Sequence, residues 1–456
     1  MNSRPNPHKR ADEGAVLRYL DDGLVLRRGR VEDTEALADF TATHVGPESP
    51  DEEIRLWAQD LMKCALPGFG PADFTVVEDT RTSAIAATLN LISQTWSYEG
   101  IEFGVGRVEL VGTDPDYRLR GLMRAQLETV HEWSAERGEM AQAITGIPWF
   151  YRRFGYEMAM EHMGGRIGAV ADVPDLKGGG AEPYALRAAT DADVAFLSRL
   201  YQISTERYAV SCVRGEEMWR YELFRRREGA MNRFETLVIE SQHGGAAGYL
   251  LLMPGLSDGV LAAVSYELAP EVSWMSATPS VLRRLRAIGE RRAEGGGPFH
   301  SIRLAFGSEH PSYEIAGDML SRFERPYAWY IRVPDMPALV GHIAPALERR
   351  LAASFAAGYS GELKLSFFDG GLRLAFQSGR LAAAEGWRAG ERDNRLAPKE
   401  RDALFPGLIF HQLLFGFRSV EELEHAFPDC IVSSDHSRAL LNVLFPRRTS
   451  RIWGLE

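Results

Sequence analysis

Alternating hydrophobic and polar residues predict that the N-terminal part of the chain contains two long strands followed by a helix. The segments SAIAATLNLISQTW and GVGRVELVGT have the composition and alternation of β-strands. Further along, Met123, Leu127 and Val130 recur at helical spacing, which places them on one face of a helix. The intervening stretch DPDYRLRGLM, which ends at Met123, is therefore predicted to be the turn between a strand and a helix.

The composition of this turn predicts an anion-binding site. A helix start exposes unpaired backbone N–H groups at the positive end of the helix dipole. Gly121 would let a phosphate approach the backbone closely, and Arg118 and Arg120 would add charge-assisted donors. We expect a ligand that carries a pyrophosphate. The alternative is a solvated basic first turn, which leaves the unfavourable interaction of two cations with the dipole unexplained.

A dinucleotide-binding motif is the obvious competing explanation for a glycine-rich strand of this kind. The sequence GVG at Gly104 to Gly106 precedes a strand instead of a helix, and it lacks the third glycine of that motif. We therefore exclude a dinucleotide-binding fold on these residues.

The chain contains an internal repeat. LVLRRGRVEDTEAL and YALRAATDADVAFL each read as a short strand that leads into a helix. The matched pairs are Leu26 with Leu186, Arg27 with Arg187, Asp33 with Asp193, and Leu37 with Leu197. Only the second copy has a favourable cap, because Thr190 precedes its helix whereas Arg30 occupies that place in the first. The repeat favours a duplicated domain over a chance likeness of two strand–helix starts.

A glycine-rich linker, Lys177 to Pro183, and a third unit complete the organisation predicted from the sequence. The third unit starts near Pro334, where GELKLSFFDGGLRLAFQSGRLAAAEG predicts antiparallel strands with tight turns. SVEELEHAF and SRALLNVLF then predict short amphipathic helices.

Composition and charge narrow the class of function. The 456 residues carry a formal net charge of −11, which argues against nucleic-acid binding and suits cationic small molecules. The N-terminus has no apolar signal-peptide region and no apolar run is long enough to span a membrane, so we expect a cytoplasmic protein. The three cysteines are far apart and the histidines form no i, i+4 pair, so we expect neither disulfides nor a metal site.

Two motifs carry a resemblance to a known family. VGTDPDYRLRGLM resembles the acetyl-CoA signature of the GNAT N-acetyltransferase superfamily, R/Q-x-x-G-x-G/A, which Arg118 and Gly121 match. Met123 departs from it, and a larger apolar residue at that position is similar to the Eis (enhanced intracellular survival) branch. About 25 residues later, IPWFYRRFGYEMA resembles a second segment of that branch.

The resemblance implies an α/β (α+β) fold class, with two tandem GNAT-fold domains followed by a sterol-carrier-protein-like domain. The implied domains are residues 1–176, 183–333 and 334–456, and the second should not bind CoA because its turn lacks glycine and arginine. It also implies acetyl-CoA as cosubstrate and a homo-oligomer, a hexamer in that family, without nucleic acid or membrane partners. The residues expected at acetyl-CoA are Val111, Thr113, Arg118, Leu119, Arg120, Gly121, Leu122 and Met123.

Acetyl transfer to an amine needs a base for the amine, a polarised thioester carbonyl and a proton for the leaving thiolate. By resemblance Tyr151 is the acid, its alternative being a core aromatic residue. By resemblance the base is the C-terminal α-carboxylate of Glu456, anchored by Trp453. Glu109, on the strand before the turn, is the alternative base.

An aromatic ring and an acidic run make up the candidate acceptor site. Trp57, Asp51, Glu52 and Glu53 suit an ammonium ligand, although a solvated helix start would explain the three acids equally well. We therefore expect an acetyl-CoA-dependent N-acetyltransferase for primary amines such as aminoglycoside-like polyamines. A protein-lysine acetyltransferase and a non-enzymatic lipid carrier, through the C-terminal domain, are the alternatives.

Overall fold

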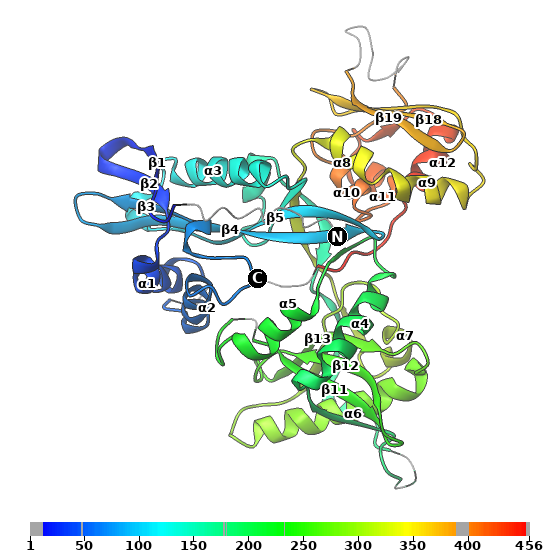
Figure 1. Cartoon of the computed structure of the whole chain (residues 1–456). Helices are drawn as coiled ribbons and strands as arrows, with labels where there is room; N and C mark the ends of the chain where they lie inside the picture. The colour runs from blue at the N-terminus through cyan, green and yellow to red at the C-terminus, as the bar shows by residue number, and fades with distance from the viewer. Residues whose placement is uncertain are drawn as a thin grey trace, which may run out of the picture.

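The chain folds into lobes that follow one another along the sequence, as the colour gradient of Figure 1 shows. The computed structural model describes residues 12–46, 49–176, 178, 180–231, 233–388 and 401–452. Within these ranges, helices of the length and apolarity that a membrane span requires were not found.

The first sheet contains the long hairpin that the alternating pattern predicts. Its order is β1-β2-β3-β4-β5-β6-β16-β7. Its strands are β1 (Val16–Tyr19), β2 (Leu24–Arg28), β3 (Phe74–Asp79), β4 (Ala84–Tyr98), β5 (Ile101–Thr113), β6 (Ala141–Ile144), β7 (Glu157–His162) and β16 (Tyr327–Arg332). Its helices are α1 (Thr34–His44), α2 (Glu52–Met62) and α3 (Leu122–Glu136).

The second sheet has the order β15-β8-β14-β13-β12-β11-β9. Its strands are β8 (Gly165–Ala169), β9 (Tyr184–Ala188), β11 (Glu235–Ser241), β12 (Ala246–Leu252), β13 (Val260–Leu268), β14 (Ser301–Leu304) and β15 (Arg322–Glu324). The helices of this domain are α4 (Val194–Thr205), α5 (Glu216–Arg220), α6 (Trp274–Ala293) and α7 (Tyr313–Ala316). The short strand β10 (Val210–Cys212) leaves this domain and pairs with β4 of the first sheet.

The two sheets are copies of one topology, which agrees with the repeat in the sequence. Read from β2 and from β9, the strands correspond one by one, with parallel pairing of β5 to β6 and of β13 to β14. Each copy, however, takes one strand from the other half of the chain. β16 follows the second domain in sequence but inserts between β6 and β7, and β8 inserts between β14 and β15.

This exchange crosses both domain boundaries expected from the sequence. Residues 165–169 belong to the second sheet although they precede residue 176, and residues 327–332 belong to the first sheet although they precede residue 333. Domain boundaries placed at a linker in the sequence cannot reveal this exchange, because a strand can pair with strands that are distant in the sequence.

The repeat also preserves an ion-pair triad. Arg27 donates to both carboxylate oxygens of Asp33 and, through Nε at 2.7 Å, to Glu78. Arg187, Asp193 and Glu240 form the same arrangement in the second copy. The Asp33 carboxylate accepts the Arg30 backbone N–H at 3.0 Å, so the first copy also satisfies its helix start. The expectation that only one copy would do so was therefore wrong: an acid three residues into a helix caps it whatever side chain precedes.

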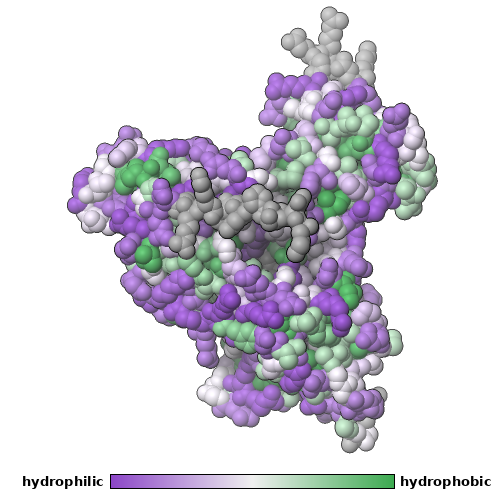
Figure 2. Space-filling view, viewed as in Figure 1, coloured by the Kyte–Doolittle hydropathy of each residue, from purple (hydrophilic) through white to green (hydrophobic). Residues whose placement is uncertain are grey.

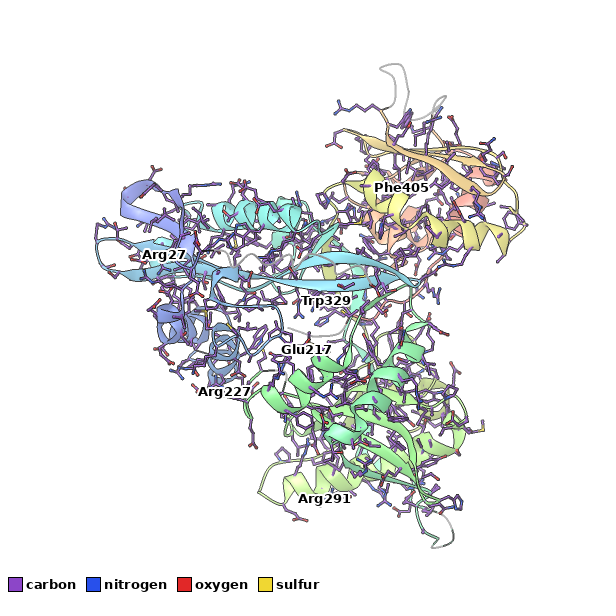
Figure 3. All side chains as sticks on the ribbon, in the orientation of Figure 1. Arg27, Glu217, Arg227, Arg291, Trp329 and Phe405 are labelled. Atoms are coloured by element: carbon purple, nitrogen blue, oxygen red, sulfur yellow. The ribbon has the colours of Figure 1, made fainter. Side chains whose placement is uncertain are left out.

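The third domain has the strands and helices predicted for it. Its strands are β17 (Gly361–Ser366), β18 (Gly371–Gln377), β19 (Arg380–Gly386), β20 (Ala403–Leu404) and β21 (Ile431–Val432). Its helices are α8 (Met336–His342), α9 (Ala344–Ala352), α10 (Phe410–Leu414), α11 (Val420–Ala426) and α12 (Asp435–Leu444). One hydrophobic cluster includes Trp96, Trp219 and Phe405, one from each domain, so the three domains pack against each other. Figure 3 marks Phe405 in this lobe.

Candidate active site

Strand β5 changes course at a β-bulge just before the glycine-containing turn. Thr88 pairs with Gly112 and Asn90 pairs with Glu109, so the two residues Leu110 and Val111 face the single residue between them on β4. Leu110 has a φ of 50°, which is the left-handed conformation that the first residue adopts in one class of β-bulge. The parallel register of β5 with β6 ends at Arg107. Because β5 continues to Thr113, the two strands separate beyond this point and leave a gap in the sheet.

The turn that follows β5 positions the start of α3. The Asp114 carboxylate accepts the Asp116 backbone N–H at 2.9 Å, and Gly121 caps α3 with a φ of 77°. A Cβ at Gly121 would meet no heavy atom within 4 Å, so the backbone conformation, and not crowding within the protein, demands glycine. Arg118, Leu119 and Arg120 are exposed around it. The structure thus confirms a strand–turn–helix here, with two arginines beside a helix start.

Tyr151 lies on the other side of the gap. A 3₁₀ helix, Phe150–Phe154, follows β6 and buries this side chain to 2% exposure. Burial raises the pKa of the Tyr151 hydroxyl, and the negative charge of Glu109 raises it further. The hydroxyl is therefore protonated in the resting protein, and the structure brings these two sequence-predicted residues within electrostatic reach of each other.

The exchanged strand β16 supplies residues to this site that were missed at the sequence level. The Tyr330 hydroxyl oxygen accepts the Trp149 backbone N–H at 2.6 Å, and its ring lies edge-on to Tyr151 with centroids 5.8 Å apart. The Tyr327 hydroxyl donates to the Gly146 carbonyl at 3.0 Å. The aromatic pattern YAWYIR is typical of a strand, but nothing in it indicates which sheet receives that strand.

A buried charged pair occupies the face of the sheet that is turned toward the second domain. Arg107 donates from Nε to Glu109 Oε1 at 2.5 Å, and its guanidinium lies 5.0 Å from the centroid of the Trp329 ring. Asn90, directly across from Glu109, is fully buried, and neither atom of its amide has a hydrogen-bond partner among the residues described. Figure 3 marks Trp329 where the first sheet meets the second domain.

The predicted acceptor residues take structural positions. Asp51 caps α2 by accepting the Ile54 backbone N–H at 3.1 Å, and Glu52 and Glu53 occupy the first turn. Trp57 is 4% exposed in a hydrophobic cluster that includes Leu110, so protein atoms cover its ring faces. Trp57 thus belongs to the hydrophobic core next to the bulge residue Leu110, and its ring is closed to a ligand in this structure.

A polar contact fixes α2 to the second domain beside this cluster. Arg227 donates to the Asp60 carboxylate from its side chain and, at 3.1 Å, from its backbone N–H. Its Nη2 also donates to the Leu56 carbonyl at 2.8 Å. Figure 3 marks Arg227 at this junction. These bonds attach α2 of the first domain to the second domain.

In the second copy the bulge is retained and the charged pair is lost. The β12–β13 register shifts at Val264 on β13, as the β4–β5 register shifts at Leu110 on β5 in the first copy. Aligning these two bulges places Ala263 at the position of Glu109 and Leu261 at that of Arg107. The Arg451 guanidinium donates to the Val264 carbonyl, so the C-terminal segment contacts the second bulge.

The C-terminal segment runs along β10, between the first two domains. Ala209 donates its backbone N–H to the Thr449 carbonyl and Arg451 donates to the Val210 carbonyl, each at 2.8 Å. Ile452, the last residue described, is buried in the same hydrophobic cluster as Trp329. Trp453 and the predicted base Glu456 lie outside the described residues.

Comparison with known proteins identifies the first domain. Residues 26–159 match the family model of the acetyltransferase (GNAT) domain. A sequence comparison with curated proteins gave no significant match. The fold resembles a probable N-acyltransferase from Enterococcus faecalis V583, with a TM-score of 0.62, 14% identity and coverage of 93% of this chain and 97% of that one.

Two further structures have the same fold over nearly the whole chain. A GCN5-related N-acetyltransferase from Kribbella flavida has a TM-score of 0.60 and 18% identity, covering 94% of this chain and 97% of its own. Eis1 from Mycobacterium abscessus has a TM-score of 0.57 and 15% identity, covering 93% and 98%. Residues 26–159 therefore match an acetyltransferase domain of the GNAT type, and this match supports an acetyltransferase activity for the chain. The three structures, at 14–18% identity, show the shared fold.

Proposed function

We propose that the protein transfers the acetyl group of acetyl-CoA directly to a primary amine at the gap between β5 and β6, with aminoglycoside-like polyamines as the acceptor class. One observation carries this proposal. The acid candidate Tyr151 and the base candidate Glu109 lie on the two sides of the gap, close enough that the negative charge of Glu109 raises the pKa of Tyr151. The turn with Gly121 adjoins the same end of β5.

The donor binds along the turn. The backbone N–H groups at the start of α3, together with Arg118 and Arg120, bind the pyrophosphate of acetyl-CoA. The thioester reaches the gap beside the bulge, where the backbone of Val111 to Thr113 is unshielded by β6. A backbone N–H there polarises the thioester carbonyl and stabilises the negative charge that develops on its oxygen.

Acetyl transfer uses a base for the amine and an acid for the leaving sulfur, which act from the two sides of the gap. A base takes a proton from the ammonium, and the amine lone pair attacks the thioester carbon and forms a C–N bond. The C–S bond breaks as the carbonyl re-forms, and the departing sulfur takes the Tyr151 proton. The second proton of the former amine nitrogen leaves as the amide forms, and it returns the Tyr151 oxygen to its protonated state. Burial raises the pKa of Tyr151. Burial also raises the pKa of a thiol in the same gap, which reduces the pKa difference between that thiol and Tyr151.

The base is one of two carboxylates. Glu109 lies beside the gap and is oriented by the hydrogen bond from Arg107. The α-carboxylate of Glu456 is the choice that the Eis resemblance implies, and it is supported by Ile452, the last described residue, which lines one pocket together with Trp329. Separate assays of Glu109→Gln and of a variant that ends at residue 452 assign the role, since turnover falls about 10²–10⁴-fold only when the base is removed.

Charge supports a polycationic acceptor. The formal net charge is −11, and hydrophilic residues dominate the face seen in Figure 2. An anionic surface raises the local concentration and the association rate of cationic substrates, in a way that salt weakens. We therefore expect kcat/KM for polyamines to fall with ionic strength more steeply than for a monoamine.

A screen of amines by CoA release tests this assignment. The panel is an aminoglycoside, a linear polyamine, a lysine-containing peptide and a monoamine, with mass spectrometry to count the acetyl groups added. We expect the aminoglycoside to have the highest kcat/KM. A preference for the peptide would favour a protein-lysine acetyltransferase, and tight fatty-acid binding without CoA release would favour a lipid carrier.

The hexamer implied by the family resemblance is part of the same proposal. Light scattering of the purified full chain at micromolar concentration measures its mass, and a monomer would contradict it.

A further inference from the structure

A buried carboxylate joins the third domain to the 3₁₀ helix that carries Tyr151. Glu157, the first residue of β7, is 2% exposed and follows that helix closely in the sequence. Its Oε1 accepts the side-chain amide of Gln412, on α10 of the third domain, at 3.2 Å. Its Oε2 accepts Nη2 of Arg152, the residue that comes directly after Tyr151. One side chain therefore contacts both the third domain and the helix of the acid candidate.

Burial makes the Glu157 carboxylate dependent on these two partners. Burial raises the pKa of the Glu157 carboxyl above its usual value, in spite of the opposing effects of Arg152 and Gln412. Gln412 is itself 4% exposed, so solvent is largely excluded from the contact between the two domains. A buried charge that loses a hydrogen-bond partner is left uncompensated, because water does not take the place of that partner. The bonds to Arg152 and Gln412 therefore fix each other's geometry through the carboxylate.

Arg152 in turn contacts the backbone segment around Tyr151. Trp149, which precedes the 3₁₀ helix, has a φ of 62°, a left-handed conformation that a bulky side chain rarely adopts. Such a conformation persists only where the surrounding structure imposes it. Two contacts do so here: the Tyr330 hydroxyl accepts the Trp149 N–H, and the Arg152 guanidinium lies 4.1 Å from the centroid of the Trp149 ring. Tyr151 lies between Trp149 and Arg152 in the chain, so its position depends on both.

We propose that Glu157 is a positioning residue through which the third domain holds Tyr151 in place. Gln412 fixes the carboxylate from the third domain, and the carboxylate fixes Arg152 beside the acid candidate. The inference rests on the proposed function, in which Tyr151 protonates the leaving sulfur. It gives the third domain a role in acetyl transfer that requires neither a lipid ligand nor the residues beyond 452.

Steady-state kinetics of the full chain and of three variants test the proposal. Glu157→Gln keeps the shape of the side chain and removes its charge, and Gln412→Met keeps the volume and removes the amide. We expect kcat to fall about tenfold in Glu157→Gln and several-fold in Gln412→Met, with KM for acetyl-CoA unchanged, because misplacing a catalytic group slows the chemical step. The double variant should be no slower than Glu157→Gln, since both changes break one chain of contacts.

Hydrogen exchange of residues 149–155, followed by mass spectrometry, tests the same link without acetyl transfer. We expect faster exchange of this segment in Gln412→Met than in the native chain. Ser437→Ala is the matched control. Ser437 is 2% exposed in the third domain and donates to Asp402 at 2.9 Å within that domain, so its loss should change neither this exchange nor kcat.

The two measurements separate this inference from the proposed function. Native exchange of residues 149–155 in Gln412→Met, or native kcat in both single variants, overturns the inference. An equal fall of kcat in Ser437→Ala also overturns it, because a general loosening of the third domain would then explain the effect. If Glu157→Gln fails to fold, Gln412→Met decides. A native chain that releases no CoA contradicts the proposed function instead, and hydrogen exchange then still decides whether Gln412 fixes the segment.

Discussion

The Tyr330 hydroxyl oxygen accepts the backbone N–H of Trp149 at 2.6 Å, although 181 residues separate the two in the sequence. Trp149 precedes the 3₁₀ helix that carries Tyr151, so a strand that follows the second domain positions the acid candidate of the first. The geometry of the site therefore depends on a strand that follows the second domain in the sequence and joins the first sheet.

Tyr330→Phe tests this relationship. The change removes the acceptor of the Trp149 backbone N–H. Because Trp149 is 63% exposed, water replaces part of the lost bond, so the change costs about 0.5–1.5 kcal/mol of stability and loosens the segment before Tyr151. We expect kcat to fall while the affinity for acetyl-CoA, bound at the Gly121 turn, changes little. Tyr327→Phe is the matched control: its hydroxyl donates to Gly146 at a more exposed position, so the loss should be smaller. Equal effects of both variants would argue against a specific role for Tyr330.

Gly121 is predicted to be needed for its backbone conformation. Its φ of 77° costs a residue with a Cβ about 1–2 kcal/mol, and asparagine tolerates that conformation better than alanine. Calorimetric titration with acetyl-CoA should therefore show the tightest binding for the native chain, weaker binding for Gly121→Asn, and the weakest of these three for Gly121→Ala. Gly121→Glu should abolish binding, because its carboxylate repels the pyrophosphate. Four equal affinities would remove the basis for a phosphate site at this turn.

The two ion-pair triads should differ in their effect on stability. The Arg27 side chain is 5% exposed and that of Arg187 is 38% exposed. Removing one partner of a buried pair costs about 3–5 kcal/mol, whereas an exposed pair contributes about 1 kcal/mol or less. In urea unfolding, Arg27→Met should thus lower the transition midpoint of its domain far more than Arg187→Met. Comparable shifts would show that burial does not distinguish the two copies.

His131 should make stability depend on pH. Burial, with a smaller effect from Arg332, lowers the pKa of His131 to about 3, and its Nε2 lies 2.8 Å from the Tyr156 hydroxyl. Below about pH 6.5 the histidine is protonated in the unfolded state but stays neutral in the folded state. Its contribution to the free energy of unfolding is therefore fully present above that pH and decreases as the pH falls toward 3. The expected slope is about 1.4 kcal/mol per pH unit for this one histidine. Thermal unfolding of His131→Gln between pH 5 and 6.5 should show a shallower decline; an identical decline would exclude His131 as its source.

The local features of the fold could be predicted from the sequence, whereas the contacts made by the exchanged strands could not. Arg27 and Asp33 recur as Arg187 and Asp193 because the triad forms within a few residues of one strand and helix start. In the structure the GVG motif lies inside β5, Ile101–Thr113, and does not lead into a helix. A Cβ at Gly106 would lie 2.4 Å from Glu139 Oε2, so this glycine makes room for a buried carboxylate.

The candidate site was predictable where its residues lie near the turn. Gly121, Tyr151 and Glu109 were proposed from motifs and from the position of one strand, and their roles stay predictions. Trp329 and Tyr330 were missed because β16 follows the whole second domain in the sequence, so no local pattern links it to the first sheet. Trp57 was ambiguous for a different reason: an aromatic residue on an amphipathic helix suits a core as well as a ligand, and only its 4% exposure decides.

The rate of CoA release from acetyl-CoA in the presence of an aminoglycoside, compared between the native chain and Tyr151→Phe, tests the central claim most directly. The account predicts acetylated amine and free CoA in equal amounts from the native chain. It predicts a kcat lower by about 10²–10⁴-fold in Tyr151→Phe, with acetyl-CoA affinity unchanged by calorimetry. Near-native turnover in Tyr151→Phe would contradict its assignment as the acid, and the absence of CoA release from the native chain with every amine of the panel would contradict acetyl transfer at this gap.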